Sequence, residues 1–68
     1  MEEGWIKIYT TDKAYQADML IELLDENEIK GVIINKRDSS NIAFGNIAVF
    51  INKEDKDKAL AIIKNSEL

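Results

Sequence analysis

Short stretches of patterned hydrophobic residues, separated by polar turns, constrain the fold of this chain more than any other feature. Alternation of apolar and polar residues around β-branched and aromatic side chains predicts a strand over residues 5–10. Continuous apolar runs that end at polar or glycine-containing turns predict two further strands over residues 32–35 and 47–51. The chain is therefore expected to build a sheet of three strands.

Apolar residues at helical spacing predict two helices, one after the first strand and one after the third. The first helix is expected to begin at a Thr11-Asp12 cap and to run to about Glu28, and the second to begin at an Asn52 cap and to end near Ser66. Their buried stripes are expected to hold Ala14, Ala17, Leu20, Ile21 and Leu24 in the first helix, and Ala59, Leu60, Ile62 and Ile63 in the second.

Packing both helices on one face of the sheet buries these stripes most economically. A right-handed crossover joins the first two strands and a long hairpin joins the second and third, which gives a ferredoxin-like β-α-β-β-α fold. The fold class is therefore α+β, with a three-stranded antiparallel sheet and two helices on one face. If the third strand is central, the first strand is an unpaired edge. Residues 1–68 are predicted to form one domain.

A chain of 68 residues without Cys or His has few means of stabilising a small core. Disulfides and the common zinc sites are excluded, which leaves self-association as an expected source of stability. The catalytic arrangements that need His or Cys are excluded as well. Carboxylates cluster at residues 25–28 and 54–57, where helix capping and solvation explain them. We predict no enzyme, no cofactor and no metal site.

The charge balance bears on location and partners. Nine Lys and Arg residues are scattered among thirteen Asp and Glu residues, and the net charge of −4 disfavours nucleic acid as a partner. No apolar run approaches the roughly 18 residues of a membrane span, and the acidic start is unlike a secretory signal. The predicted location is the cytoplasm, without membrane attachment.

Several large apolar residues are out of phase with the side chains predicted to face the helices. The inward set is expected to be Ile6 and Ile8, Val32 and Ile34, and the alternate residues of 47–51. The candidate interface on the outer sheet face is then Trp5, Tyr9, Ile33, Ala48 and Phe50. One interpretation is that a small sheet carries scattered apolar residues outside. The preferred interpretation is a contiguous patch that meets a second subunit or another protein.

A secondary patch is expected on the first helix. Tyr15, Met19 and Leu23 stand at i, i+4 and i+8, on a flank turned away from Ala14 and Ile21. This flank either packs against the second helix, covers loop residues such as Phe44, or forms a groove for a partner.

The loop between the second and third strands is a candidate anion or ligand site. Its arginine, Arg37, stands close to the hydroxyls of Ser39 and Ser40, and Phe44 and Gly45 follow. Ser, Asn and Asp are also ordinary turn residues, so a solvated hairpin loop is the alternative.

The order of residues resembles a known family. The shared features are a strand entry at residues 8–11, a helix-to-strand turn at 28–29, Ala43-Phe44-Gly45, and the strand end and helix start at 49–55. Over nearly the whole chain these features are similar to the DUF2007 family, prokaryotic proteins to which a signal-transducing role is ascribed. The family typically has glycine where this chain has Glu28, and often proline where it has Asn52. The resemblance implies a bacterial, ferredoxin-like or PII-like regulatory module without established catalytic residues.

These features predict a small non-enzymatic module for regulation, signal transduction or protein interaction. It is expected to be a homodimer, through the outer sheet face or the edge of the first strand. The alternative is a sensor of PII-like type for an anionic metabolite, which binds between subunits or in the loop at residues 37–45.

Overall fold

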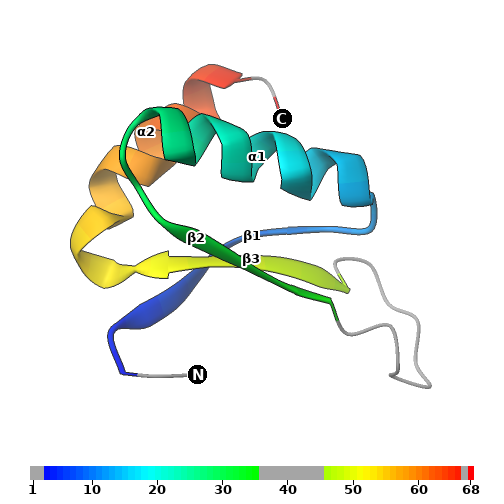
Figure 1. The fold of residues 1–68 in the computed structure, drawn as a ribbon, viewed down its shortest axis with the longest axis horizontal. Coiled ribbons are helices and arrows are strands. Elements are labelled where there is room, and N and C mark those ends of the chain that lie inside the picture. The colour runs from blue at the N-terminus through cyan, green and yellow to red at the C-terminus, as the bar shows by residue number, and fades with distance from the viewer. Residues whose placement is uncertain (1–2, 36–45, 67) are drawn as a thin grey trace.

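The computed structural model describes residues 3–35, 46–66 and 68. Strands and helices follow the predicted β-α-β-β-α order, and a short 3-10 helix, η1, precedes the second α-helix (Figure 1). The elements are β1 (Trp5–Thr11), α1 (Ala14–Glu26), β2 (Gly31–Asn35), β3 (Ile47–Asn52), η1 (Lys53–Asp55) and α2 (Lys56–Ser66).

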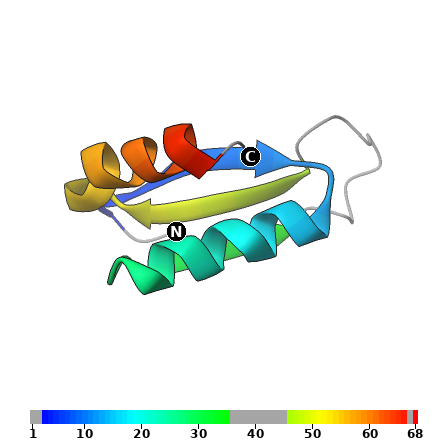
Figure 2. The ribbon, with the colours of Figure 1, turned by 90° about the horizontal axis from the view of Figure 1, so that it is seen from above.

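The three strands form one antiparallel sheet in the order β1-β3-β2. Both α-helices lie on the same face of this sheet, with α1 over β2 and α2 over β1 (Figure 2). The α+β fold with β3 in the centre is thus confirmed, and its topology is consistent with a ferredoxin-like layout. Within the part of the chain that the structure describes, no helix lies over the opposite face of the sheet (Figure 1).

The core lies between the helices and the sheet and is small. Its largest fully buried side chains are Leu20 and Leu24 of α1 and Val49 and Ile51 of β3. Each contributes about 1.5–3 kcal/mol through burial. The other members of the buried cluster are Ala17, Ile29, Ile47 and Ala59, and the partly buried residues packed on it are Ile6, Ile8, Tyr9, Ile21, Ile62, Ile63 and Leu68.

The buried stripe of α2 differs from the prediction at one position. Ala59 is fully buried, and Ile62 and Ile63 pack against the core. Leu60, which was expected beside them, is 44% exposed. The position next to a buried residue is turned by about 100° around a helix, so Leu60 points away from the sheet.

The start of α1 also differs from the expected Thr11-Asp12 cap. The N-cap residue is Lys13, which makes no side-chain capping bond. The reason is that β1 continues through Thr11, which stands two residues before the N-cap, so its hydroxyl does not accept from a backbone N–H of the first helical turn. It accepts a hydrogen bond from the backbone N–H of Lys13 instead, at 3.1 Å.

The end of α1 is a Schellman motif, so the helix ends at Glu26 and the expected end near Glu28 is wrong. The backbone N–H of Ile29 donates to the carbonyl of Leu24, and that of Glu28 donates to Asp25. Glu28 takes the left-handed conformation, with φ of 62°. Glycine adopts this conformation without a steric cost, and Glu28 occupies it here. The motif turns Ile29 into the core, where it is 2% exposed.

The junction between β3 and α2 follows the sequence prediction in part. The side-chain carbonyl of Asn52 accepts a hydrogen bond from the backbone N–H of Glu54 at 2.9 Å, so Asn52 is a cap, but it caps η1 and not α2, which begins at Lys56. Farther along, Lys58 Nζ donates to the backbone carbonyl of Asn27 at 3.0 Å. This bond ties the start of α2 to the end of α1.

Candidate functional site

The uncovered face of the sheet carries a group of apolar side chains outside the core. Side chains of directly paired residues lie on the same face, so the register assigns each position. Phe50 of β3 lies between Lys7 of β1 and Val32 of β2. In the next row Ala48 lies between Thr10 and Ile34. Trp5 pairs with Asn52 and is therefore diagonal to Phe50.

These apolar positions form what we call the outer-face patch, which consists of Trp5, Val32, Ile34, Ala48 and Phe50. Ala48 is only 5% exposed although no helix covers it, because its neighbours are larger. The other four are half-buried. The register places Trp5, Ala48 and Phe50 of the predicted interface together on this face.

Tyr9 is absent from this face, and its predicted position is wrong. The pairing of β1 with β3 shifts between Lys7 and Tyr9, where Ile8 forms a β-bulge. The extra residue reverses the alternation, so Tyr9 pairs with Val49 and packs against the core beneath the helices. Alternation along the sequence does not indicate such a bulge.

Ile33 is also on the helix side of the sheet, and Val32 and Ile34 take the outer positions that were not predicted for them. Ile33 pairs with the buried Val49, and Gly31, two residues earlier, lies against α1. A Cβ atom on Gly31 would stand 2.7 Å from Ile21 Cδ1, so this close approach fixes which face of β2 meets the helix. Ile33 nevertheless stays 37% exposed, because β2 is an edge strand.

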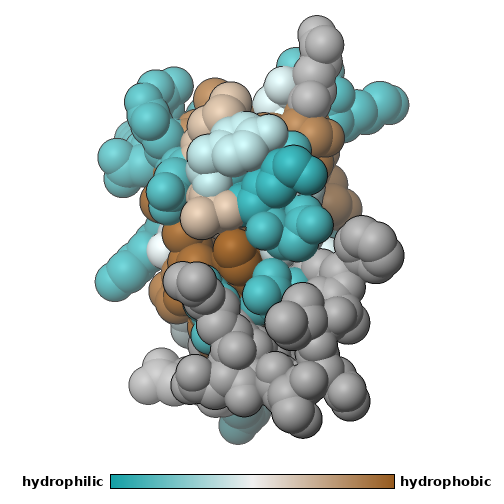
Figure 3. Space-filling view, turned by 90° about the vertical axis from the view of Figure 1, so that its right-hand side faces the viewer, coloured by the Kyte–Doolittle hydropathy of each residue, from teal (hydrophilic) through white to brown (hydrophobic). Residues whose placement is uncertain are grey.

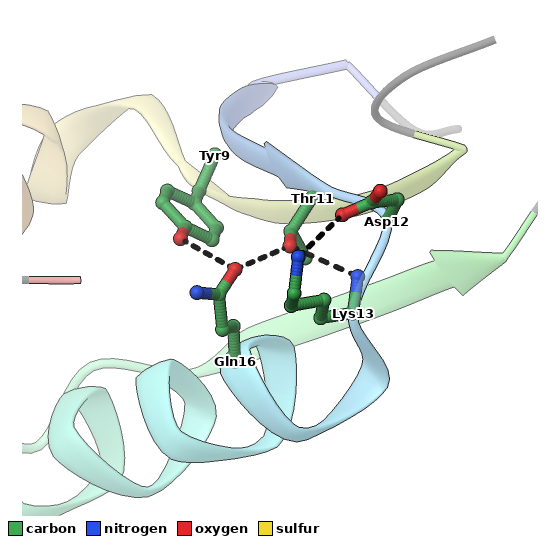
Figure 4. Close-up of polar contacts among 5 residues, drawn as sticks. All are labelled: Tyr9, Thr11, Asp12, Lys13 and Gln16. Carbon is green, nitrogen blue, oxygen red and sulfur yellow. Dashed lines mark hydrogen bonds and ion pairs between the residues drawn. The ribbon is translucent and has the colours of Figure 1, made fainter.

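Tyr9, on the helix side of the sheet, belongs to a polar cluster that joins β1 to α1 (Figure 4). Gln16 Oε1 accepts a hydrogen bond from the Thr11 hydroxyl at 2.6 Å and one from the Tyr9 hydroxyl at 3.4 Å. Thr11 is 7% exposed. The cluster satisfies polar groups at the covered end of β1 and holds the first turn of α1 against the strand.

A hollow lies at the end of the molecule where α1 begins. Its lining residues come from the turn before α1, the start of α1, the end of β2 and the start of β3. Figure 3 views this end of the molecule, where hydrophilic and hydrophobic side chains both reach the surface. The hollow has a volume of about 310 Å³ and is lined by Asp12, Ala14, Asn35, Asn46 and Ile47. Asn46 Oδ1 is buried without a hydrogen-bond partner among the described residues.

The secondary patch is present on α1. Tyr15 is 59% exposed and Met19 is 48% exposed, whereas Leu23 is half-buried. Met19 and Leu23 line a groove of about 300 Å³ together with Glu22, Glu26 and Ser66, the last residue of α2. The end of α2 thus borders this flank of α1 without covering it.

The candidate ligand loop, Arg37, Ser39, Ser40, Phe44 and Gly45, lies outside the described residues. Within residues 3–35, 46–66 and 68, acidic side chains nowhere form a group that could hold a metal ion. No helix in that part of the chain has the length and apolar composition needed to cross a membrane.

Comparison with protein families decides the assignment. Residues 5–67 match the model of a family described as "putative prokaryotic signal transducing protein". The chain belongs to the DUF2007 family. The match covers all the helices and strands, so the resemblance noted in the sequence is confirmed. Neither curated proteins nor solved structures give a significant match to the chain.

Membership in DUF2007 supports a signal-transducing module as a class and assigns no residue a role. Reasoning from the sequence missed Gln16, Val32 and Ile34. Gln16 is a polar residue in the first turn of α1, five residues after Thr11, and this spacing could have indicated a hydrogen bond between β1 and α1. The faces of Val32 and Ile34 cannot be read from the sequence, because β2 is apolar at three successive positions.

Proposed function

We propose that this member of DUF2007 is a small non-enzymatic regulatory or protein-interaction module that pairs with a second copy through the outer-face patch. The observation that carries the proposal is the continuous set of five apolar side chains on a sheet face that no helix covers. The small core supports the proposal. Because few residues are buried in it, burial of the patch between two copies would add to the stability of the chain. We propose the prokaryotic cytoplasm as its location, on the basis of the family description.

The edge of β1, the other surface considered for pairing, is less suited to this role. The bulge at Ile8 interrupts the regular row of backbone groups that a second strand would need. Lys7 is exposed beside it. Bulges and lysines are common means by which edge strands avoid pairing, so the outer-face patch is the better surface.

The expected dimer is weak. Three strands of five to seven residues present a face of roughly 300 Å². A standard interface buries about 800 Å² on each partner. We therefore expect a dissociation constant of about 10–100 μM. Small-molecule sensing of the PII-like type is supported only by analogy of fold, because the loop proposed to bind the ligand lies outside the described residues.

The test is the solution mass measured over a concentration series by sedimentation equilibrium. The native chain is expected to approach the mass of a dimer at several hundred micromolar, whereas Trp5→Ser/Phe50→Ser is expected to stay a monomer. A matched control, Tyr15→Ser/Met19→Ser, removes one aromatic and one apolar side chain from exposed positions of α1. It should dimerise like the native chain.

A second variant guards against loss of folding. Ile34→Lys places a charge within the patch, and circular dichroism checks that the helices and strands remain. A native chain that stays monomeric throughout the series contradicts the proposal. So does a folded Ile34→Lys variant that dimerises with unchanged affinity.

A further inference from the structure

The negative charge of the chain is concentrated on α1 and its flanks. Residues 12–30 contain six acidic residues and two lysines, a net charge of −4, which equals the net charge of all 68 residues. The remaining segments are therefore neutral in sum. Within α1 the acidic residues are Asp18, Glu22, Asp25 and Glu26, and the helix has no basic residue.

This arrangement does not stabilise the helix. Asp25 and Glu26 lie in the last turn, where the helix dipole disfavours anions, and α1 has no basic residue of its own there. Lys58 of α2 reaches this end of the helix, but its ammonium donates to the backbone carbonyl of Asn27 rather than to either carboxylate. Glu22 stands four residues from both Asp18 and Glu26, a spacing at which like charges repel. The ion pair in the described part of the chain, Lys13 Nζ to Asp12 Oδ1 at 3.7 Å, involves none of these carboxylates. Helix stability therefore does not explain the acidic face.

The acidic residues border an apolar groove. Met19 and Leu23 supply its apolar lining, Glu22 and Glu26 stand one turn apart beside them, and Ser66 closes it from α2. Tyr15 extends the apolar row by one turn and is 59% exposed. The groove thus presents an apolar row and a parallel acidic row, each repeating every four residues along α1. This surface is distinct from the outer-face patch on the other side of the sheet.

We propose that this α1 groove docks an amphipathic, lysine- or arginine-rich helix of another protein. A helix repeats its side chains with the same period as α1, so it can place apolar residues on Met19 and Leu23 and cations against Glu22 and Glu26. Methionine adapts its shape to different apolar partners. A second copy of α1 does not fit, because its acidic row would face an identical acidic row.

The test uses a designed probe and the full chain. The probe is a helical peptide of about 18 residues, roughly 27 Å long, with leucines along one face and lysines on the others. Two control peptides are used. One has the same composition as the probe in scrambled order, and the other has glutamate in place of each lysine. Amide chemical shifts of the labelled chain report the site of binding. We expect saturable shifts at Met19, Glu22, Leu23, Glu26 and Ser66 with the basic amphipathic peptide alone, weakened by added salt.

Matched variants separate the groove from overall charge. Glu22→Gln/Glu26→Gln is expected to raise the dissociation constant about three- to tenfold. Glu3→Gln/Asp12→Asn removes the same charge from exposed positions outside the groove, and it should leave the constant within about twofold. The outer-face variant Trp5→Ser/Phe50→Ser should bind the peptide like the native chain.

Several outcomes would overturn the proposal. They are the absence of saturable shifts up to about 1 mM peptide, equal weakening by both charge variants, equal binding of the scrambled peptide, and shifts centred on the outer-face patch. A change in solution mass caused by Glu22→Gln/Glu26→Gln would also overturn it, because the occupant would then be a second copy. None of these results contradicts dimerisation through the outer-face patch, which is tested separately by sedimentation equilibrium.

Discussion

The two faces of the sheet have similar apolar composition and different surroundings. β3 supplies both of them: Val49 and Ile51 are completely buried under the helices, and Ala48 and Phe50 lie on the side without a helix. Five of the six residues of β3 are apolar, the composition of a strand that is buried on both sides. The difference indicates that the core of one chain needs only the face under the helices, and that the face without a helix is available for an interaction.

The largest expected effect comes from truncating neighbouring residues on opposite faces. Ile51→Ala should lower the free energy of unfolding by about 2–5 kcal/mol, because Ile51 is fully enclosed and leaves a cavity. Phe50→Ala removes more atoms from a half-buried position and should cost about 1 kcal/mol in the monomer. Urea denaturation at low micromolar concentration measures both, since self-association contributes little there. Equal losses in the free energy of unfolding would mean that Phe50 contributes to the monomer as much as a core residue does, and would contradict the difference between the two faces.

The covered face was largely predictable from the sequence. Of the stripe that helical spacing predicts in α1, Ala17, Leu20 and Leu24 are buried and Ile21 is half-buried. Ala14 is exposed, because it lies at the very start of the helix. The alternate residues of β3 were assigned correctly to the helix side because β3 is central and its pairing is regular next to β2. Where a helix stripe and a central strand must meet, local periodicity and burial agree.

The open face was predicted only in part, for two physical reasons. A bulge at Ile8 moved Tyr9 to the covered side, and a bulge depends on pairing between distant strands rather than on local pattern. In β2 the run Val32-Ile33-Ile34 has no alternation, so the close contact of Gly31 with α1 determined the faces. Both errors concern edge strands, where one neighbouring strand is missing.

A smaller effect is expected from paired threonine substitutions at the end of β1. Thr11→Val removes the hydroxyl that donates to Gln16 Oε1 and accepts from the Lys13 N–H, at a buried position. The expected loss of stability is about 1–2 kcal/mol. Thr10→Val makes the same chemical change on the exposed, open side and should be nearly neutral. Thermal unfolding of both variants measures the difference, and a larger loss for Thr10→Val would contradict the assignment of faces.

The smallest expected effect is a gain in stability at the turn that leads into β2. Glu28 holds a left-handed conformation, with φ of 62°, at the Schellman position that glycine most often occupies in proteins. Glu28→Gly should stabilise the chain by about 0.5–1 kcal/mol, because relief of the steric cost outweighs the greater freedom of glycine in the unfolded chain.

Glu28→Ala separates the backbone effect from the charge. Alanine removes the carboxylate near the negative end of the α1 dipole and keeps the Cβ atom, so any gain it shows is electrostatic. The difference between the glycine and alanine variants in urea denaturation then measures the net backbone effect, which is the relief of the steric cost less the greater freedom of glycine in the unfolded chain. If alanine stabilises as much as glycine, the left-handed backbone is not the cause. If both gains disappear in high salt, the acidic face of α1, rather than the turn, limits the stability of the covered side.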